Sequence, residues 1–368
     1  MRHVRLISVA LFTSIAVSLV AAQLAVASPQ APHSATATPT ASSGIGLALG
    51  LSGPNAVPLA NATFYDRALK SSQWVQIGSG LVYKSCDYSV PNGSYVDSIN
   101  DKFFLPGGKV ETVKPCPYPR LVLPASKGAS GEPQAASTQG KVGASTPLSS
   151  ASVVQGYQQE FYENNVGPIG SLQVDQAAPA KPSAGSAILF DWTGIESSDN
   201  STLLQPILGI CGLATSKDGV VIENASTCKY VWMAAYYTWG GNAVAAGVVQ
   251  VNALDTIEDY MDAESCKAGA WDCTWFMQMY DANTGDASEF TIGTSPPDTV
   301  LIGGAYEANN WSVCTDWFSN HHLVWRNLAV FAEESGAPIT PRWSKNIYST
   351  ACSLSTTDSA TSGDMTYS

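Results

Sequence analysis

Short runs of β-branched and aromatic residues, separated by turn-forming residues, fill the second half of the chain. One pair of runs flanks residues 281–286, D-A-N-T-G-D, which have the chemistry of a hairpin turn. No long segment repeats its apolar residues with the 3.6-residue period of a helix. Many short strands joined by turns are typical of a β-sandwich, so we expect an all-β main domain. The predicted strands are 230–239, 245–251, 275–280, 289–292, 299–308 and 323–331.

The first 28 residues have the composition of a secretory signal peptide. Arg2 and Arg5 precede an apolar run over 6–22, and Ala-Val-Ala at 25–27 fits a small-x-small cleavage site. A transmembrane anchor is the alternative, but Ser and Thr interrupt the run and no second long apolar run follows it. We therefore expect a secreted protein, extracellular or periplasmic, with no membrane partner once the signal has been removed.

Eight cysteines follow this segment, and an even number in an oxidising compartment predicts four disulfides. The sequence alone does not determine their connectivity. We predict pairing in chain order: Cys86 with Cys116, Cys211 with Cys228, Cys266 with Cys273, and Cys314 with Cys352. The chain contains no C-x-x-C pattern, which argues against a zinc or redox motif.

Composition divides the rest of the chain. Residues 29–43 are rich in Ala, Pro, Ser and Thr and are expected to be a disordered tail. A small β-rich N-terminal region follows at 44–124, and 125–151 has no aromatic residue and the composition of a flexible linker. The main domain is predicted to span 152–350. The Ser/Thr-rich tail at 351–368 is expected to fray.

The net charge of −12 is unevenly distributed. Residues 29–151 carry nine basic and six acidic side chains, whereas 152–368 carry seven basic and 24 acidic ones. A chain without a basic excess is a poor candidate for binding nucleic acid. The asymmetry suggests the hypothesis that 44–124 is a propeptide, docked by charge near neutral pH and released in acid after cleavage in the linker.

Gln205 is the polar exception in an apolar predicted strand. In the segment 201–208, S-T-L-L-Q-P-I-L, Leu203, Gln205 and Ile207 share one face. Burying an amide without a partner costs about 1–3 kcal/mol. Gln205 therefore either bonds to neighbouring backbone in the core or lines a groove, and spacing alone favours the core.

Glu307 ends a second apolar strand. Alternation places Leu301, Gly303, Ala305 and Glu307 on one face, and the small residues leave open space beside the carboxylate. Such a carboxylate lies either at the rim of a sheet or in a cleft. The pattern does not by itself single out Glu307 among the 30 acidic residues.

Other groupings give weaker signals. The acidic residues between 255 and 264 lack an EF-hand pattern, so a solvated acidic loop is expected rather than a calcium site. The adjacent His321 and His322 cannot together chelate one metal from a strand, and we expect them in a loop. The aromatic residues at 236–239 fit either core packing or stacking on a sugar or peptide. Motifs for nucleophile elbows, zinc proteases and phosphate-binding loops are absent from the sequence, and no metal or cofactor is predicted.

Several short segments occur in an order that resembles one family. They are D-W-T-G-I at 191–195, L-L-Q-P-I-L at 203–208, Y-Y-T-W at 236–239, L-D-T-I at 254–257 and E-A-N-N-W at 307–311. The resemblance is to the glutamic peptidases (eqolisins), especially their divergent secreted relatives, and covers about 157–343. That family has W-x-G-I, I-L-Q, W-Y-x-W and G-D-x-I segments and a late strand that carries a Glu.

The resemblance implies a concanavalin-like double β-sandwich whose concave sheet forms a substrate groove. It implies Gln205 and Glu307 as the catalytic pair, with Trp192, Trp239 and Tyr237 binding substrate. The implied activity is secreted acid endopeptidase: Glu307 takes a proton from a water, the water attacks the scissile carbonyl, and Gln205 stabilises the oxyanion.

The chain departs from the family pattern at several positions. Thr238 stands where the family has an acid, Leu254 stands where it has Gly, and Glu307 precedes Trp311 by four residues instead of one. An alternative interpretation is therefore a non-catalytic concanavalin-like protein at the cell surface or one that binds carbohydrate. The partner is a polypeptide substrate in the first case and a glycan in the second.

Overall fold

Strands joined by turns make up nearly all of the part of the chain that a computed structural model describes. All of these residues belong to one unit, Leu47–Ser368. Within that part, the few helical turns are short 3₁₀ turns, and no helix is long and apolar enough to cross a membrane. The all-β prediction is confirmed. The described residues are 56–58, 73–77, 80–118, 120–122, 156–164, 166–183, 187–197, 201–211, 230–266, 273–294, 298–333 and 335–368.

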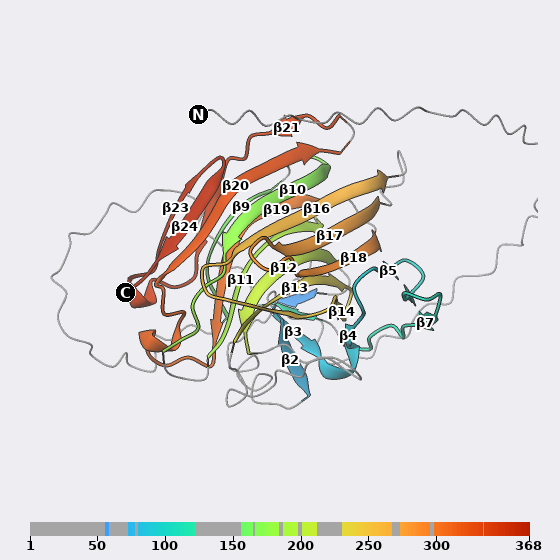
Figure 1. Ribbon diagram of the computed structural model, residues 1–368, viewed down its shortest axis with the longest axis horizontal. Coiled ribbons are helices and arrows are strands. Elements are labelled where there is room, and N and C mark those ends of the chain that lie inside the picture. Colours follow the sequence, from blue (N-terminus) through green and yellow to red (C-terminus); the bar gives the residue numbers. More distant parts are fainter. Residues whose placement is uncertain are drawn as a thin grey trace, which may run out of the picture. The chain divides into compact units, whose positions relative to one another are not determined.

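Two large sheets and one small sheet contain these strands (Figure 1). The first, called the β10 sheet, consists in spatial order of β23 (Ser355–Ser359), β24 (Ser362–Thr366), β20 (His322–Ala332), β10 (Ile169–Ala177), β16 (Thr256–Cys266), β17 (Cys273–Asp281), β18 (Ala287–Thr294), β5 (Ser94–Asp97), β6 (Lys102–Phe104) and β7 (Val110–Thr112), with β21 (Pro338–Ile339) beside β20. The second, called the β11 sheet, consists of β22 (Ser344–Ile347), β9 (Gly156–Glu163), β19 (Asp298–Asn309), β11 (Ile188–Ser197), β12 (Thr202–Ile210), β13 (Val231–Trp239), β14 (Asn242–Ala245) and β4 (Asp87–Ser89), with β15 (Val249–Val251) also beside β13. The small sheet consists of β1 (Ala56–Pro58), β8 (Arg120–Val122), β3 (Gly80–Tyr83) and β2 (Trp74–Ile77).

The β10 and β11 sheets pack face to face and form the sandwich core. Strand β13 contacts β17 and β18, and β10 contacts β11 and β19. Leu189, Leu204 and Met233 from one sheet join Met261 and Trp275 from the other in one buried cluster. Burial alternates residue by residue along β17, as expected for a strand with one face in a core.

The β11 sheet is buried on its other face as well, which we call the outer face. There Phe190, Trp192 and Ile207 form a second apolar cluster with Ile77 and Val82 of the small sheet. In Figure 1, β2 and β3 lie beside the β14 end of this sheet, and β3 contacts β14. Burial on both faces explains why β12 and β13 are buried along their whole length and read as continuous apolar runs.

Most of the predicted strands are present, with two local differences. Residues 245–251 form the separate strands β14 and β15 around a short break. In β19, the register against β11 shifts between the partners of Trp192 and Gly194. As a result Leu301 packs in the sandwich core while Ile302 and Ala305 lie on the outer face. Strict alternation therefore placed Leu301 on the wrong face, because it took no account of a β-bulge.

Two segments expected to be irregular are strands. The acidic segment 255–264 was expected to be a loop, yet most of it lies in β16, where Ile257, Asp259 and Met261 point inward and are buried. The tail after Cys352 forms β23 and β24 instead of fraying, because Met365 is buried in the core and β24 pairs with β20.

The described disulfides agree with pairing in chain order. Three bonds join Cys86 to Cys116, Cys266 to Cys273 and Cys314 to Cys352. Cys228, the predicted partner of Cys211, lies outside the described residues, as do the signal segment 1–28, the tail 29–43 and the linker 125–151.

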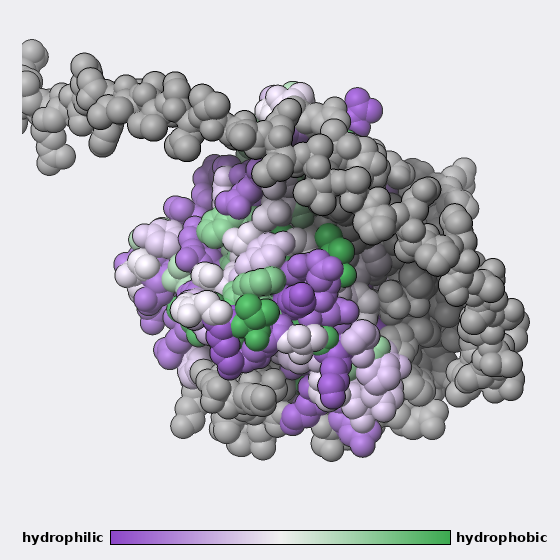
Figure 2. Space-filling model, turned by 90° about the vertical axis from the view of Figure 1, so that its right-hand side faces the viewer, coloured by the Kyte–Doolittle hydropathy of each residue, from purple (hydrophilic) through white to green (hydrophobic). Residues whose placement is uncertain are grey.

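The surface on the side that carries β5 and β7 is mostly hydrophilic, with small hydrophobic patches (Figure 2). Exposed apolar side chains in the β5–β7 region are Ile99, Phe104 and Val110. Apolar residues scattered in this way are ordinary on a protein surface, so they do not indicate a docking site.

Candidate active site

Glu307 lies on the outer face of the β11 sheet. Strand β19 runs between β9 and β11, and the register places Glu307 opposite Phe190 on one side and Tyr157 on the other. Its side chain is 1% exposed, and the indole Nε1 of Trp192 donates a hydrogen bond of 2.9 Å to its Oε1. Burial raises the pKa of Glu307 well above its usual range, although the bond from Trp192 and the charge of Arg120 lower it in part.

Gln205 lies on the same face, between Leu203 and Ile207 and opposite Tyr236 of β13. The side chain is fully buried, and neither its Nε2 nor its Oε1 has a hydrogen-bond partner among the described residues. The core interpretation, in which Gln205 bonds to neighbouring backbone, is therefore not what the structure contains. A buried amide of this kind is costly unless another molecule satisfies it.

The register separates Gln205 from Glu307 along this face. Phe190 lies opposite both Glu307 and Gly209, and Gln205 is four residues from Gly209 along β12. With about 3.3 Å per residue and about 4.8 Å per strand, the two Cα atoms are on the order of 16 Å apart. The two side chains share a face, but in this arrangement one water molecule does not bridge them.

The three predicted substrate-binding aromatic residues divide between the two faces. Trp192 is on the outer face, in contact with Glu307. Tyr237 and Trp239 point into the sandwich core, where their rings stack with centroids 5.4 Å apart. Side chains alternate along β13, so Tyr236 is the aromatic residue of that segment that lies beside Gln205.

Glu160 is a second buried carboxyl group on the outer face, which the sequence analysis did not single out. It lies on β9 opposite Ala305, and its Oε1 accepts hydrogen bonds from Asn346 Nδ2 at 2.6 Å and from Tyr348 Oη at 3.0 Å. Burial raises the pKa of Glu160, and these two hydrogen bonds oppose the rise. The sequence gives no clear signal for Glu160, because Y-Q-Q-E-F-Y at 157–162 does not alternate apolar and polar residues and its pairing with β19 contains a register shift.

The N-terminal region contributes a buried cation to this face. Arg120 of β8 is 1% exposed, donates to Thr238 Oγ1 at 2.8 Å and pairs with Glu196 Oε1 at 3.4 Å. Glu196 and Thr238 both stand opposite Leu203, two residues from Gln205, so Arg120 reaches the part of the face that holds Gln205. Sequence reasoning missed Arg120 because nothing local distinguishes it from other basic residues.

Other contacts also fix the N-terminal region in place. The hydroxyl of Tyr236 donates to Asp87 Oδ1 at 2.5 Å, and burial raises the pKa of Asp87 to about 8. At the turn after β13, a Cβ on Gly241 would lie 2.0 Å from the carbonyl oxygen of Tyr118, so only glycine permits this approach. The described part of the predicted N-terminal region thus packs on the outer face of the β11 sheet at β13 and β14.

A cavity of about 390 Å³ lies where the N-terminal region meets the β13–β14 turn. Asp101, Asn242 and Trp239 contribute to its lining, and Trp239 Nε1 donates to Asp101 Oδ1 at 3.2 Å. Trp239 therefore lines this cavity and packs in the sandwich core, at a different place from Glu307.

Two further carboxyl groups are buried inside the sandwich. Asp259 accepts hydrogen bonds from Gln176 Nε2 and, at 3.4 Å, from Thr193 Oγ1. Asp191 has no hydrogen-bond partner for its carboxyl oxygens within the described ranges. Burial raises the pKa of Asp259 to about 8 and that of Asp191 well above its usual range. These groups lie away from the outer face and affect stability.

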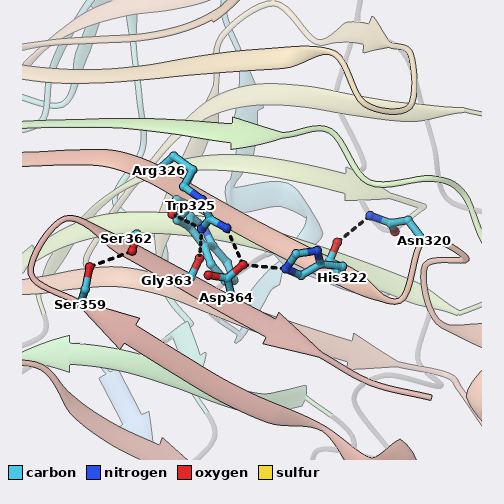
Figure 3. A network of polar contacts seen from close by, with 8 residues as sticks. All are labelled: Asn320, His322, Trp325, Arg326, Ser359, Ser362, Gly363 and Asp364. Atoms are coloured by element: carbon cyan, nitrogen blue, oxygen red, sulfur yellow. Dashed lines mark hydrogen bonds and ion pairs between the residues drawn. The ribbon is translucent and has the colours of Figure 1, made fainter.

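His322 belongs to a surface network at the C-terminal strands (Figure 3). It begins β20 instead of lying in a loop, and its Nε2 is 2.6 Å from Asp364 Oδ1, which Arg326 Nη2 also contacts at 2.6 Å. The hydroxyls of Ser359 and Ser362 bond to each other at 2.8 Å, so this network does not form a nucleophile with His322.

One grouping of potential metal ligands occurs in the part that the structure describes. It consists of Cys266, Cys273 and Glu333, and its two sulfur atoms form a disulfide.

Comparison with known proteins gives distant likenesses. No protein-family model and no curated protein match the sequence. Among solved structures, the chain is similar to scytalidoglutamic peptidase with a peptide-based transition-state analogue, at 13% identity and a TM-score of 0.40, over 58% of this chain and 98% of that one. The chain is also similar to the same peptidase with a transition-state analogue inhibitor, at 12% identity and a TM-score of 0.38, over 59% of this chain and 100% of that one. Aspergilloglutamic peptidase from Aspergillus niger is similar at 13% identity and a TM-score of 0.28, over 49% of this chain and 99% of that one. The function is therefore argued from the residues of the site.

Proposed function

We propose that this chain is the latent form of a secreted acid endopeptidase whose active surface is the outer face of the β11 sheet. The observation that carries the proposal is the position of Glu307. Its Oε1 is fixed by Trp192, whereas its Oε2 receives no hydrogen bond from the described residues. A carboxylate held in place with one oxygen available to a reacting group is what general-base catalysis by a side chain requires.

In this proposal Glu307 is inactive while it is buried and becomes a base in acid only after the face has been uncovered. Under the cover, burial raises the pKa of Glu307 and holds the group in its protonated form. Exposure to water lowers the pKa towards the ordinary value of about 4.3 for Glu, so the carboxylate becomes an effective base in mildly acidic solution.

Gln205 fits a role in binding extended substrate. Its distance from Glu307 along the face, on the order of 16 Å, corresponds to about five residues of an extended polypeptide. Its unpartnered amide offers one donor group and one acceptor to a substrate backbone. We therefore propose that a polypeptide lies across β19, β11 and β12, with its scissile bond at Glu307 and a neighbouring peptide group at Gln205.

The N-terminal region, 44–124, acts in this proposal as the propeptide. Arg120 and Asp87 occupy the face on which substrate would lie. Cys86 and Cys116 pair within that region, and no described disulfide joins it to the residues after 156. Cleavage between 125 and 151 would then leave no described covalent link between the two parts.

Incubation of the purified chain at pH 3 to 7 tests this function. We expect cleavage between 125 and 151, release of the N-terminal region in acid, and hydrolysis of denatured casein at pH 3–5. Glu307→Gln should abolish hydrolysis with β-sheet circular dichroism unchanged, whereas Glu258→Gln, which removes an exposed carboxylate from β16, should not.

Other outcomes contradict the proposal. Full activity of Glu307→Gln excludes Glu307 as the base, and a mature N-terminus near Pro29 at every pH excludes the propeptide. Retention on an insoluble glycan without casein cleavage at any pH supports the carbohydrate-binding alternative.

A further inference from the structure

We propose that Glu160 is the second catalytic carboxyl group of this site, donating a proton to the substrate carbonyl while Glu307 activates the water. The inference rests on the proposed function and replaces the oxyanion role that the resemblance assigns to Gln205. It identifies a residue on the first strand of the main domain that no segment of the resemblance contains.

The register brings Glu160 close to Glu307. Strands β9 and β19 are adjacent, Glu160 lies opposite Ala305, and Glu307 lies opposite Tyr157. A register shift between Tyr306 and Glu307 leaves Glu160 two positions from Glu307 on the same face. Diagonal neighbours of this kind have Cα atoms about 7–8 Å apart, within reach of two Glu side chains. Gln205, by contrast, lies beyond β11.

An aromatic frame fixes both carboxyl groups around one ring. Trp192 donates to Glu307, and Tyr348 donates to Glu160. The ring of Tyr157 contacts both donors, with centroids 5.9 Å from Trp192 and 5.6 Å from Tyr348. The two carboxyl groups are therefore positioned by one connected set of side chains, as a catalytic pair requires.

Each carboxyl group has one fixed and one available oxygen. The Oε1 of Glu307 and the Oε1 of Glu160 accept the hydrogen bonds from the frame. Neither Oε2 receives a hydrogen bond from the part of the chain that the structure describes.

The surroundings of Glu160 and Glu307 favour a state in which the two carboxyl groups share one proton. The titratable groups that face it are Tyr157 on β9, Tyr348 after β22, Glu196 on β11 and the cation Arg120 on β8. Burial raises the pKa of both carboxyl groups, and the charge of Glu160 raises that of Glu307 further. Interacting carboxyls of this kind lose their protons in two separate steps, so one is ionised while the other is still protonated.

The proposed steps balance in protons and bonds. Ionised Glu307 takes a proton from water as the water oxygen bonds to the carbonyl carbon, and protonated Glu160 gives its proton to the carbonyl oxygen. In the resulting diol, one hydroxyl returns its proton to Glu160 as the C=O bond re-forms. The C–N bond breaks, and Glu307 passes its proton to the leaving amine. Both residues end in their starting states.

A purely structural role for Glu160 predicts different mutant behaviour. In that role Glu160 would only link β9 to Asn346 of the neighbouring strand β22 and to Tyr348, which follows β22. Glu160→Gln keeps a carbonyl oxygen for both donors and removes the acidic proton. Glu163→Gln, the matched control, makes the same change at another carboxyl group of β9, one that accepts a hydrogen bond from Arg342 N at 2.7 Å and lies outside the pair.

The experiment measures casein or peptide hydrolysis by the acid-released protein. We expect Glu160→Gln to lower kcat by about 100-fold or more with KM changed little and thermal unfolding unchanged. Glu163→Gln should keep the wild-type kcat. Wild-type activity in Glu160→Gln overturns the assignment of Glu160 alone, whereas an inactive wild type overturns the proposed function and the catalytic role with it.

A readout independent of activity tests the pairing itself. Carboxyl carbon chemical shifts, followed in the intact chain from pH 3 to pH 9, report the titration of Glu307. We expect the pKa of Glu307 to fall in Glu160→Gln, because the neighbouring negative charge has been removed. An unchanged titration overturns the inference that the two carboxyls interact.

Discussion

Trp192 and Glu307 are joined across adjacent strands by a hydrogen bond of 2.9 Å from the indole Nε1 to the carboxyl Oε1. The two are diagonal neighbours, since Trp192 itself lies opposite Ala305. Both side chains are buried on the outer face of the β11 sheet, so the bond forms where water is largely excluded. An aromatic side chain of one strand thus fixes the carboxyl group of the next.

Replacing Trp192 with Phe should leave Glu307 without this donor. The pKa of Glu307 should rise further, because the hydrogen bond from Trp192 lowers it. The stability cost should exceed that of Trp232→Phe by about 1–3 kcal/mol. Trp232 packs on the same face, and its Nε1 has no hydrogen-bond partner in the described residues, so it controls for the loss of ring volume. Urea unfolding at pH 4 measures the stability cost of each variant. Equal costs for Trp192→Phe and Trp232→Phe would mean that the hydrogen bond to Glu307 contributes nothing to stability.

Stability should fall as the pH rises from 4 to 8. Burial raises the pKa of Asp87 and of Asp259 to about 8, against about 3.9 for an unfolded Asp. Between these values the folded chain binds more protons than the unfolded chain, so their contribution is complete below pH 4 and is lost as the pH approaches 8. Each group contributes a slope of up to about 1.4 kcal/mol per pH unit.

Asp259→Asn isolates one of these groups. Asn keeps an oxygen that accepts from Gln176 and Thr193 but does not ionise. The free energy of unfolding, measured in urea at pH 4, 6 and 8, should therefore depend less steeply on pH than in the wild type. An unchanged slope would show that Asp259 does not titrate in this range.

Local patterns of β-branched, aromatic and turn residues predicted several strands directly. The strands at 230–239 and 299–308, and the hairpin around 281–286, followed from β-branched runs and turn residues. The segment 255–264 was misjudged because its many acids suggested a loop. Its alternation, with Ile257 and Met261 inward, was the better guide.

Long-range pairing limited what could be predicted about the site. Alternation predicted which neighbours share a strand face with Gln205 and, in part, with Glu307. The distance between the two residues along the sheet depends on how β11 pairs with β12 and β19 and on the bulge in β19. No local pattern contains that register. Glu160 and Arg120 reach the same face from distant segments, and a single sequence carries no signal for such a meeting.

Arg120 should control the pH dependence of the cover. After a protease site placed in 125–151 has been cut, the two parts should co-elute at pH 7 and separate at pH 4. In acid, protonation of Glu196 leaves the buried guanidinium without its ion-pair partner, and for release this loss must outweigh the opposite effect of Asp87, whose raised pKa favours the covered state in acid. Arg120→Met should weaken the association at pH 7 by about 10-fold or more.

Lys109→Met provides the matched control for this experiment. It removes another cation of the N-terminal region, but one whose ion pair with Glu111 is exposed, so association should change little. Equal effects of the two substitutions would assign the association to net charge instead of to the contact made by Arg120.

The C-terminal strands should depend modestly on Asp364. Partial burial alone would raise its pKa, but hydrogen bonds from Arg326 and His322 lower it below the usual value. The stabilisation is therefore present above the ordinary Asp pKa and is lost as the pH falls through the lowered one. Because these side chains are partly exposed, Asp364→Asn should cost less than about 1 kcal/mol. Hydrogen exchange in β23 and β24 should accelerate at pH 7; unchanged exchange would contradict the contact.

Gln205→Leu should separate stability from function. Both polar atoms of Gln205 are buried without a partner among the described residues, so Leu removes a desolvation cost that no hydrogen bond offsets. The free energy of unfolding of the intact chain should stay the same or rise by up to about 2 kcal/mol. The released domain should bind peptide substrates more weakly, seen as a higher KM, because the amide no longer meets the substrate backbone.

Gln76→Leu is the control, since Gln76 is equally buried and unpartnered but lies on β2 of the cover. It should change the unfolding free energy in the same direction and leave the released domain unaffected, because β2 departs with the cover. Unchanged KM in Gln205→Leu would remove Gln205 from substrate binding. A loss of stability of about 1–3 kcal/mol in that variant would show that the amide has a partner within the fold.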